Sequence, residues 1–205
     1  MEPARRTVLA GMKPARRTTA PPSASVAQPS DQLLPGEFLL PDGTPALIWP
    51  LLPTDAEALR DGFRRLSGDS RRHRFLTVLG ELDDSMIRRL VDSVDGVQHI
   101  ALVLVVLPPQ GSEGPVGVAR LLQYTDDPAT ADIAVTVADD WQAHGVGTAL
   151  VSALLRRRPE VVTRLRTVVD AGNEASLALL AGAGRLSLDP PERGVRDVTV
   201  DLTAA

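Results

Sequence analysis

The spacing of apolar residues changes several times along this chain, and each spacing predicts a different element. Residues 99–107 are apolar at nearly every position, which is typical of a central strand covered on both faces. Residues 117–124 and 131–137 follow after loops and predict two further strands, each antiparallel to the one before. A shorter strand over residues 46–51 precedes them, with Pro50 suited to a sheet edge.

Helical spacing alternates with these strands. Apolar side chains recur every three or four residues in the segment after a Thr54-Asp55 cap, again over residues 82–91, and again from residue 146 until Pro159. The last helix leads into a strand over residues 165–169, which should run parallel to the strand before the helix. Residues 185–188 and 195–202 predict a closing hairpin. The pattern therefore indicates an α/β (α+β) chain with a mixed, mostly antiparallel sheet.

A strand, two glycines and a helix meet between Val135 and Leu150. Gly145 and Gly147 allow backbone N–H groups to approach a ligand, and the helix that begins there adds about half a positive charge from its macrodipole. The turn therefore predicts an anion site, with a pyrophosphate as the expected ligand.

Two familiar phosphate loops match this turn poorly. A P-loop needs a lysine where this chain has Thr148, and a dinucleotide fingerprint needs a third glycine where it has Leu150. Asp170 at the end of the next apolar run keeps the dinucleotide interpretation open.

The segment Gln142-Ala-His-Gly-Val-Gly-Thr148 resembles the Q/R-x-x-G-x-G/A acyl-CoA loop of the GNAT N-acetyltransferase superfamily. Asn173 to Gly184 resembles the second signature of that family, an asparagine that opens a helix ending in glycine. The resemblance covers about residues 45–202 and implies a GNAT-type twisted sheet flanked by helices. It also implies these residues for acyl-CoA binding: Val135, Val137, Gln142, His144, Gly145, Val146, Gly147, Thr148, Asn173 and Ser176.

By this resemblance, most of all to bacterial protein-lysine acetyltransferases, the chain is expected to be an acetyl-CoA-dependent N-acetyltransferase. The acceptor would be a protein lysine or a small primary amine, and no metal is needed. Asp132 stands where such relatives carry a glutamate general base, although a solvated residue at a strand start is an equal interpretation from the sequence alone. Leu180 replaces the tyrosine that protonates the leaving thiolate in many members. The alternative is therefore a catalytically weak or inactive acyl-CoA-binding regulatory module.

Three other groups have plainer interpretations. The basic run from Arg71 to Arg74 is read as a solvated helix face, with the rim of an acceptor groove as the alternative. His99 is expected to be a surface or hydrogen-bonded structural residue, and Tyr124 a packing residue.

Amino-acid composition and charge give the remaining expectations about domain boundaries, partners and location. Residues 1–40 are rich in Pro, Ala, Ser, Thr and Arg and predict a disordered tail before a single domain over residues 45–203. Five basic residues against one glutamate give residues 1–30 a charge of +4, so the total of −4 leaves −8 on the rest, which argues against binding to nucleic acid. No cysteine is present and no apolar run reaches the roughly 18 residues of a membrane span. We expect a cytoplasmic protein with acetyl-CoA and an amine acceptor as partners and no membrane contact, and we allow for a homodimer.

Overall fold

A single sheet organises the part of the chain that the computed structural model describes, which is residues 36–76, 80–107 and 114–204. The strands lie in the order β1-β2-β3-β4-β5-β6-β8-β7, and every neighbouring pair is antiparallel except β5 and β6. The strands are β1 (Gly36–Leu39), β2 (Pro45–Pro50), β3 (His99–Val106), β4 (Gly114–Gln123), β5 (Thr130–Val137), β6 (Arg164–Asp170), β7 (Arg185–Leu188) and β8 (Val195–Asp201).

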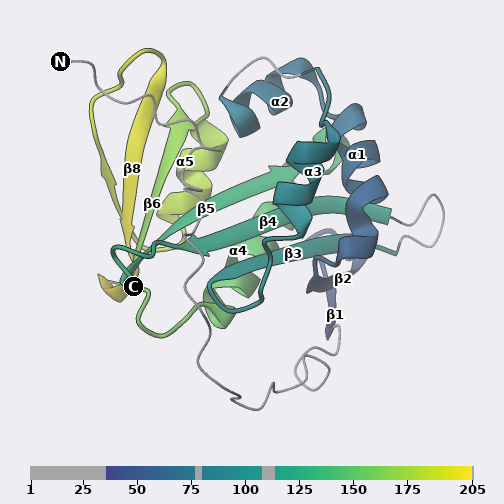
Figure 1. The fold of residues 1–205 in the computed structure, drawn as a ribbon, viewed down its shortest axis with the longest axis horizontal. Coiled ribbons are helices and arrows are strands. Elements are labelled where there is room, and N and C mark those ends of the chain that lie inside the picture. The colour runs from purple at the N-terminus through teal and green to yellow at the C-terminus, as the bar shows by residue number, and fades with distance from the viewer. Residues whose placement is uncertain (1–35, 77–79, 108–113, 205) are drawn as a thin grey trace, which may run out of the picture.

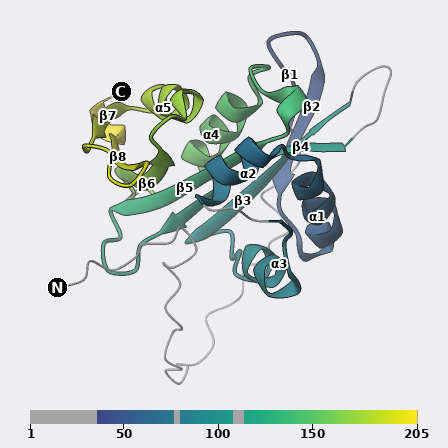
Figure 2. The ribbon, with the colours of Figure 1, turned by 90° about the horizontal axis from the view of Figure 1, so that it is seen from above.

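Helices cover both faces of this sheet (Figures 1 and 2). Helices α1 (Ala56–Arg65), α2 (Gly68–Phe75) and α3 (Asp84–Val91) lie on one face, and α4 (Val146–Arg157) and α5 (Glu174–Ala181) lie on the other. Short 3-10 turns over Pro53–Asp55, Asp139–Trp141 and Leu202–Ala204 complete the list. None of the helices in the described residues is long and apolar enough to cross a membrane.

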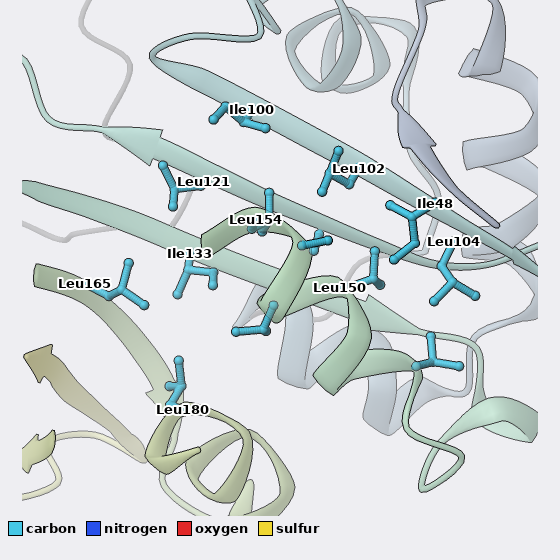
Figure 3. Close-up of a cluster of buried hydrophobic side chains, with 14 of the residues drawn as sticks. Ile48, Ile100, Leu102, Leu104, Leu121, Ile133, Leu150, Leu154, Leu165 and Leu180 are labelled. Carbon is cyan, nitrogen blue, oxygen red and sulfur yellow. The ribbon is translucent and has the colours of Figure 1, made fainter. Parts of the chain in front are cut away.

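The main core lies between the sheet and α4 (Figure 3). Leu150 and Leu154 of α4 are fully buried against Leu102 and Leu121 of the central strands. All eight residues of β3 are buried, because its alternate side chains pack against the helices on the opposite face. The continuous apolar run at residues 99–107 is thus confirmed as a central strand covered on both faces.

Helix α4 packs unusually close to β4, and a glycine makes this possible. A Cβ atom at Gly117 would lie 2.8 Å from side-chain carbons of both Leu150 and Val146. The helix that follows the glycine turn is therefore fixed against the sheet by contacts that a larger residue at 117 would prevent.

The expected mixed sheet, the hairpins and the parallel crossover are all confirmed. The sheet begins earlier than predicted, since β1 lies within the segment assigned to the tail and its Gly36 to Leu39 pair with Ile48 to Pro45. Phe38 and the buried Leu40 pack on the main core, which explains why this short segment is ordered. The predictions for residues 1–35 lie outside the described residues.

The predicted Thr54-Asp55 cap is also different in detail. These residues form a 3-10 turn ahead of α1, and the Asp55 carboxylate accepts a hydrogen bond from the Leu52 N–H (2.8 Å) instead of capping the helix with its side chain.

Candidate active site

The pairing of β5 with β6 ends almost as soon as it begins. Only Thr130↔Arg164 and Ala131↔Leu165 are paired, and the two strands then diverge (Figure 1). We call the gap beyond Ala131↔Leu165 the β5–β6 opening. A gap of this kind exposes backbone donors and acceptors that a continuous sheet would use internally.

The hydrogen bonds of β5 show which residues face the β5–β6 opening. Ala138 donates its N–H to Val116 of β4 and Thr130 accepts from Tyr124, so even-numbered residues direct their backbone groups to β4. In an antiparallel ladder the intervening residues point the other way. Val135 and Val137, both predicted to bind acyl-CoA, therefore present their N–H groups to the opening.

The turn between β5 and α4 is built around two left-handed residues. Ala143 has φ of 62° and Gly145, which precedes the first residue of α4, has φ of 83°. A Cβ at Gly145 would also lie 2.7 Å from the Pro41 ring, so both backbone conformation and space require glycine here. The sequence interpretation gave ligand approach as the reason for this glycine, and the structure adds these two local ones.

The start of α4 offers unpaired backbone donors. The first turn of a helix leaves its N–H groups without intrahelical acceptors, and here those groups belong to Val146, Gly147 and Thr148. Val146 is only 1% exposed and packs its side chain in the core, so only its backbone can meet a ligand. The added helix dipole makes this end of α4 suitable for an anion such as a pyrophosphate.

Gly147 lies beside the route from this helix end to the β5–β6 opening. A Cβ atom there would be 3.3 Å from Leu179 of α5 and 3.8 Å from Val137 of β5. A side chain at 147 would therefore enter the space between β5 and α5.

Gln142 and His144 hold the turn together. The Gln142 side-chain nitrogen lies within hydrogen-bond reach of the Asp139 carboxylate (3.0 Å) and the Ser70 hydroxyl (3.1 Å). His144 Nδ1 lies 2.8 Å from the Gln142 carbonyl oxygen, and its exposed ring packs near Trp141. These contacts leave the backbone of the turn as its most available ligand-binding surface.

Asp139 is a central residue that the sequence interpretation missed. Its carboxylate accepts from the Ser67 N–H (2.6 Å), the Ser67 and Ser70 hydroxyls and the Gln142 amide, and so joins the turn before α4 to the first residues of α2. Burial alone would raise the pKa of Asp139, but these hydrogen bonds outweigh it and hold the pKa below its ordinary value. Its position directly before the glycine turn was the only signal in the sequence.

Asn173 caps α5 as predicted, since its Oδ1 accepts from the Ser176 N–H (3.0 Å). Its N–H donates to Asp170 at the end of β6 (2.9 Å), which places this cap at the far side of the β5–β6 opening. Leu180 points into the main core and is 5% exposed. Its apolar side chain supplies no acid to a leaving thiolate.

Asp132 faces the α2 side of β5, opposite the core that contains its neighbours Ala131 and Ile133. Its Oδ1 is buried and has no hydrogen-bond partner among the described residues. Burial raises the pKa of Asp132, although the charge of the Arg74 guanidinium opposes this. The Thr167 hydroxyl donates its proton to the Ile133 carbonyl (3.0 Å), so the unpartnered oxygen stays available to a ligand or water.

Helix α2 lies across β5 near the β5–β6 opening (Figure 2). Its basic run does not form a single solvated face. Arg72 is exposed as that interpretation requires, but Arg71 donates to the carbonyls of Arg64 and Gly80, and Arg74 is half-buried and interacts electrostatically with Asp132. His73 Nε2 lies 3.9 Å from Asp170 at the end of β6. The helix therefore lies close to both β5 and the end of β6, and its place at the rim of an acceptor groove stays a prediction.

His99 is the hydrogen-bonded structural residue that the sequence predicted. It is buried, its Nδ1 donates to the Ser93 carbonyl (2.9 Å), and its Nε2 accepts from Arg120 (3.1 Å). Burial lowers the pKa of His99, and the Arg120 charge lowers it further. Arg120 itself was missed, although an arginine inside an apolar strand is an available signal of a buried charge.

Together these elements suit an acyl-thioester. Backbone N–H groups at the β5–β6 opening can meet the charge that develops on a carbonyl oxygen, and the start of α4 can hold a pyrophosphate. No group of three or more metal-ligating side chains occurs within residues 36–76, 80–107 and 114–204.

Comparison with known proteins agrees with this geometry. Residues 47–185 match the family model described as an acetyltransferase (GNAT) domain. The chain is 30% identical over 154 residues to Acetyltransferase PA5475 of Pseudomonas aeruginosa, covering 75% of this chain and 81% of that protein. It is also 30% identical over 107 residues to Acetyltransferase Pat of Mycolicibacterium smegmatis, covering 52% of this chain and 30% of that protein.

The fold is also found in a solved structure. The GNAT domain of S. lividans PAT superposes with a TM-score of 0.67 at 23% identity, covering 82% of this chain and 97% of that domain. Because the family model covers residues 47–185 and a relative is 30% identical over most of both chains, the chain belongs to the GNAT acetyltransferase family.

Proposed function

We propose that this protein is an acetyl-CoA-dependent N-acetyltransferase that acts on a primary amine, either a protein lysine or a small amine. The observation that carries the proposal is the β5–β6 opening, where the N–H groups of Val135 and Val137 continue toward the unpaired N–H groups at the start of α4. Acetyl-CoA is the cosubstrate of the family, and this path would take its thioester at the opening and its pyrophosphate at the helix.

The proposed reaction moves one acetyl group from sulfur to nitrogen, while the nitrogen of the ammonium loses two protons and the thiolate gains one. The amine nitrogen bonds to the acetyl carbon while the carbon–sulfur bond breaks, and the N–H group of Val135 stabilises the negative charge on the carbonyl oxygen. The amine must first lose a proton, because a lysine-like ammonium has a pKa of about 10.4. Asp132 accepts that first proton. After attack the nitrogen releases its second proton to solvent, and the departing CoA thiolate takes up one proton from solvent.

The Asp132 side chain is too short to contact the amine directly, so a water would have to bridge them. Strand residues advance by about 3.3 Å each, so Val135 lies roughly 10 Å along β5 from Asp132. The short aspartate side chain would therefore act through a water at its unpartnered Oδ1. The raised pKa of Asp132 makes it a better base than an exposed aspartate.

An acyl-CoA-binding regulatory module that is catalytically weak or inactive is the second candidate. The buried leucine at position 180 favours it, because it provides no acid for the leaving thiolate. A thiol pKa of about 8.5 makes a thiolate an acceptable leaving group without such an acid, so we favour the enzyme.

Release of free CoA from acetyl-CoA, measured with a panel of amines and lysine peptides, separates the two candidates. For the enzyme, Asp132→Asn should lower the maximal rate by about 10²-fold with little change in acetyl-CoA affinity, while Asp132→Glu should retain or exceed the wild-type rate. CoA binding without turnover of any amine would instead favour the regulatory module. An Asp132→Asn rate equal to that of the wild type would remove Asp132 from the mechanism.

A further inference from the structure

A cavity of about 170 Å³ lies between the sheet and helices α1, α2 and α3. This is far more than the roughly 10–15 Å³ that a single water needs. Its wall is mainly apolar, with Leu59, Phe63, Phe75 and Val118 among its members. Three charged residues also line it: Arg74, Arg120 and Asp55.

The partners of Arg120 are all neutral. It donates to the buried His99 ring and to the Leu90 carbonyl, and it is 8% exposed. Burial, with repulsion from Arg74, lowers the pKa of Arg120 to about 9, so the group is still charged at neutral pH. Its position is fixed from within the protein, and its charge has no carboxylate in ion-pair contact among the described residues.

Arg74 has fewer partners still. Its guanidinium lies 4.9 Å from the ring centre of Phe75, and within the described part of the chain it has neither a hydrogen-bond acceptor nor an acid at ion-pair distance. A guanidinium carries five N–H donors in a planar fork, and those of this half-buried side chain are available to an anion. This arrangement is typical of a group that awaits an anionic ligand.

The charges around the cavity suit a ligand that has an amine at one end and an anionic group at the other. Arg74 and Arg120 share the cavity wall with one acid, Asp55, whose carboxylate accepts a hydrogen bond from the Leu52 N–H; Asp132, outside the wall, interacts electrostatically with Arg74. The cavity extends to Thr136, the neighbour of Val135 on β5. An amine directed to Asp132 and the thioester would leave the other end of its molecule beside Arg74.

We propose that the acceptor is a small amine that also carries a carboxylate and an apolar body, as an apolar amino acid does, and that Arg74 binds this carboxylate in the cavity. The carboxylate fits the planar fork of a guanidinium with two parallel hydrogen bonds. The apolar body occupies the wall formed by α1 and α2. That the amine is an acetyl acceptor rests on the proposed function. Binding of the carboxylate by Arg74 can be tested separately.

The test compares apolar amino acids with their carboxamides, which differ only in the charged group. With acetyl-CoA, wild-type protein should turn over at least one amino acid with a KM about tenfold or more below that of its carboxamide. Arg74→Gln should raise the KM of the amino acid about tenfold or more and leave that of the carboxamide nearly unchanged. Arg72→Gln, an exposed position on the same helix, is the matched control and should behave as wild type.

Binding of the same amino acids, measured by calorimetry without turnover, separates this inference from the proposed function. If amino acids bind and Arg74→Gln weakens them but no amine is acetylated, the carboxylate site stands and the transferase proposal fails. If carboxamides or lysine peptides are acetylated as well as amino acids are, the transferase stands and this inference is overturned. It is also overturned if Arg74→Gln impairs only transfer from a dicarboxylic acyl-CoA such as succinyl-CoA, since the carboxylate would then belong to the donor.

Discussion

The carboxylate of Asp139 joins the turn before α4 to helix α2, and its removal should weaken both. Asp139→Asn keeps the shape of the side chain but replaces one acceptor oxygen with a donor. In either orientation of the amide, the Ser67 N–H or the Gln142 amide loses its acceptor. The substitution therefore tests whether this link stabilises the site.

The expected cost follows from those hydrogen bonds. An unsatisfied donor at a site of this kind costs about 1–3 kcal/mol, and we expect the lower half, about 1–2 kcal/mol, because Asp139 is partly exposed. In a domain of this size each kcal/mol shifts Tm by about 2–4 °C, so Tm should fall by about 2–8 °C. Because α2 carries His73 and Arg74, turnover should fall as well.

The dependence on pH adds an independent check. The pKa of Asp139 lies below its ordinary value of 3.8, so its contribution to stability is full above that value and is lost as pH falls through the folded-state pKa. The difference in Tm between wild type and Asp139→Asn should thus be complete near pH 7 and shrink at acidic pH.

Asp140→Asn is the matched control. Asp140 is the adjacent exposed residue, it loses the same charge, and it makes no hydrogen bond within the described residues. Thermal unfolding of the three proteins followed by circular dichroism measures the effect. Equal Tm values for the two variants would refute the reasoning.

Further predictions concern the core, the base and the tail. Gly117→Ala should destabilise the fold by about 1–3 kcal/mol in chemical denaturation, because its Cβ would clash with α4, whereas Gly114→Ala, with open space around it, should not. Asp132→Asn should raise Tm at neutral pH while it lowers activity. Because the pKa of Asp132 is raised in the folded protein, ionisation of this carboxyl destabilises the fold as pH rises above its ordinary value of 3.8. The gain in Tm should therefore vanish at low pH. A chain that starts at Leu34 should keep the Tm and the CoA affinity of the full chain, and a large loss of either would show that residues 1–33 belong to the domain.

Local patterns predicted most of the fold. The uninterrupted apolar run at residues 99–107 predicted a central strand covered on both faces, and the glycine turn with its helix indicated the crossover and predicted an anion site. Strand β1 escaped prediction because four residues are too few for an alternating pattern, and its order comes from pairing with β2 and from Phe38 on the core.

Residues of the candidate site could be predicted from the sequence only where they belong to a recognisable motif. Gly145 and Asn173 lie in recognisable motifs, and the structure explains each by local geometry. The roles of Asp139, Arg74 and Arg120 depend on contacts between residues far apart in the chain. Arg74 looked like one of four solvated basic residues, because a short helix pattern does not show which side chain turns inward.

The measurement that tests the account most directly is acetyl-CoA binding by calorimetry to wild type, Gly147→Glu and Gly80→Glu. Both variants add the same side chain and charge, but Gly80 is exposed with open space around it, whereas a side chain at 147 enters the space between β5 and α5. We predict wild-type affinity for Gly80→Glu, and loss of binding for Gly147→Glu in protein that circular dichroism shows to be folded. Wild-type affinity in folded Gly147→Glu would contradict the assignment of acetyl-CoA to the β5–β6 opening and the turn before α4.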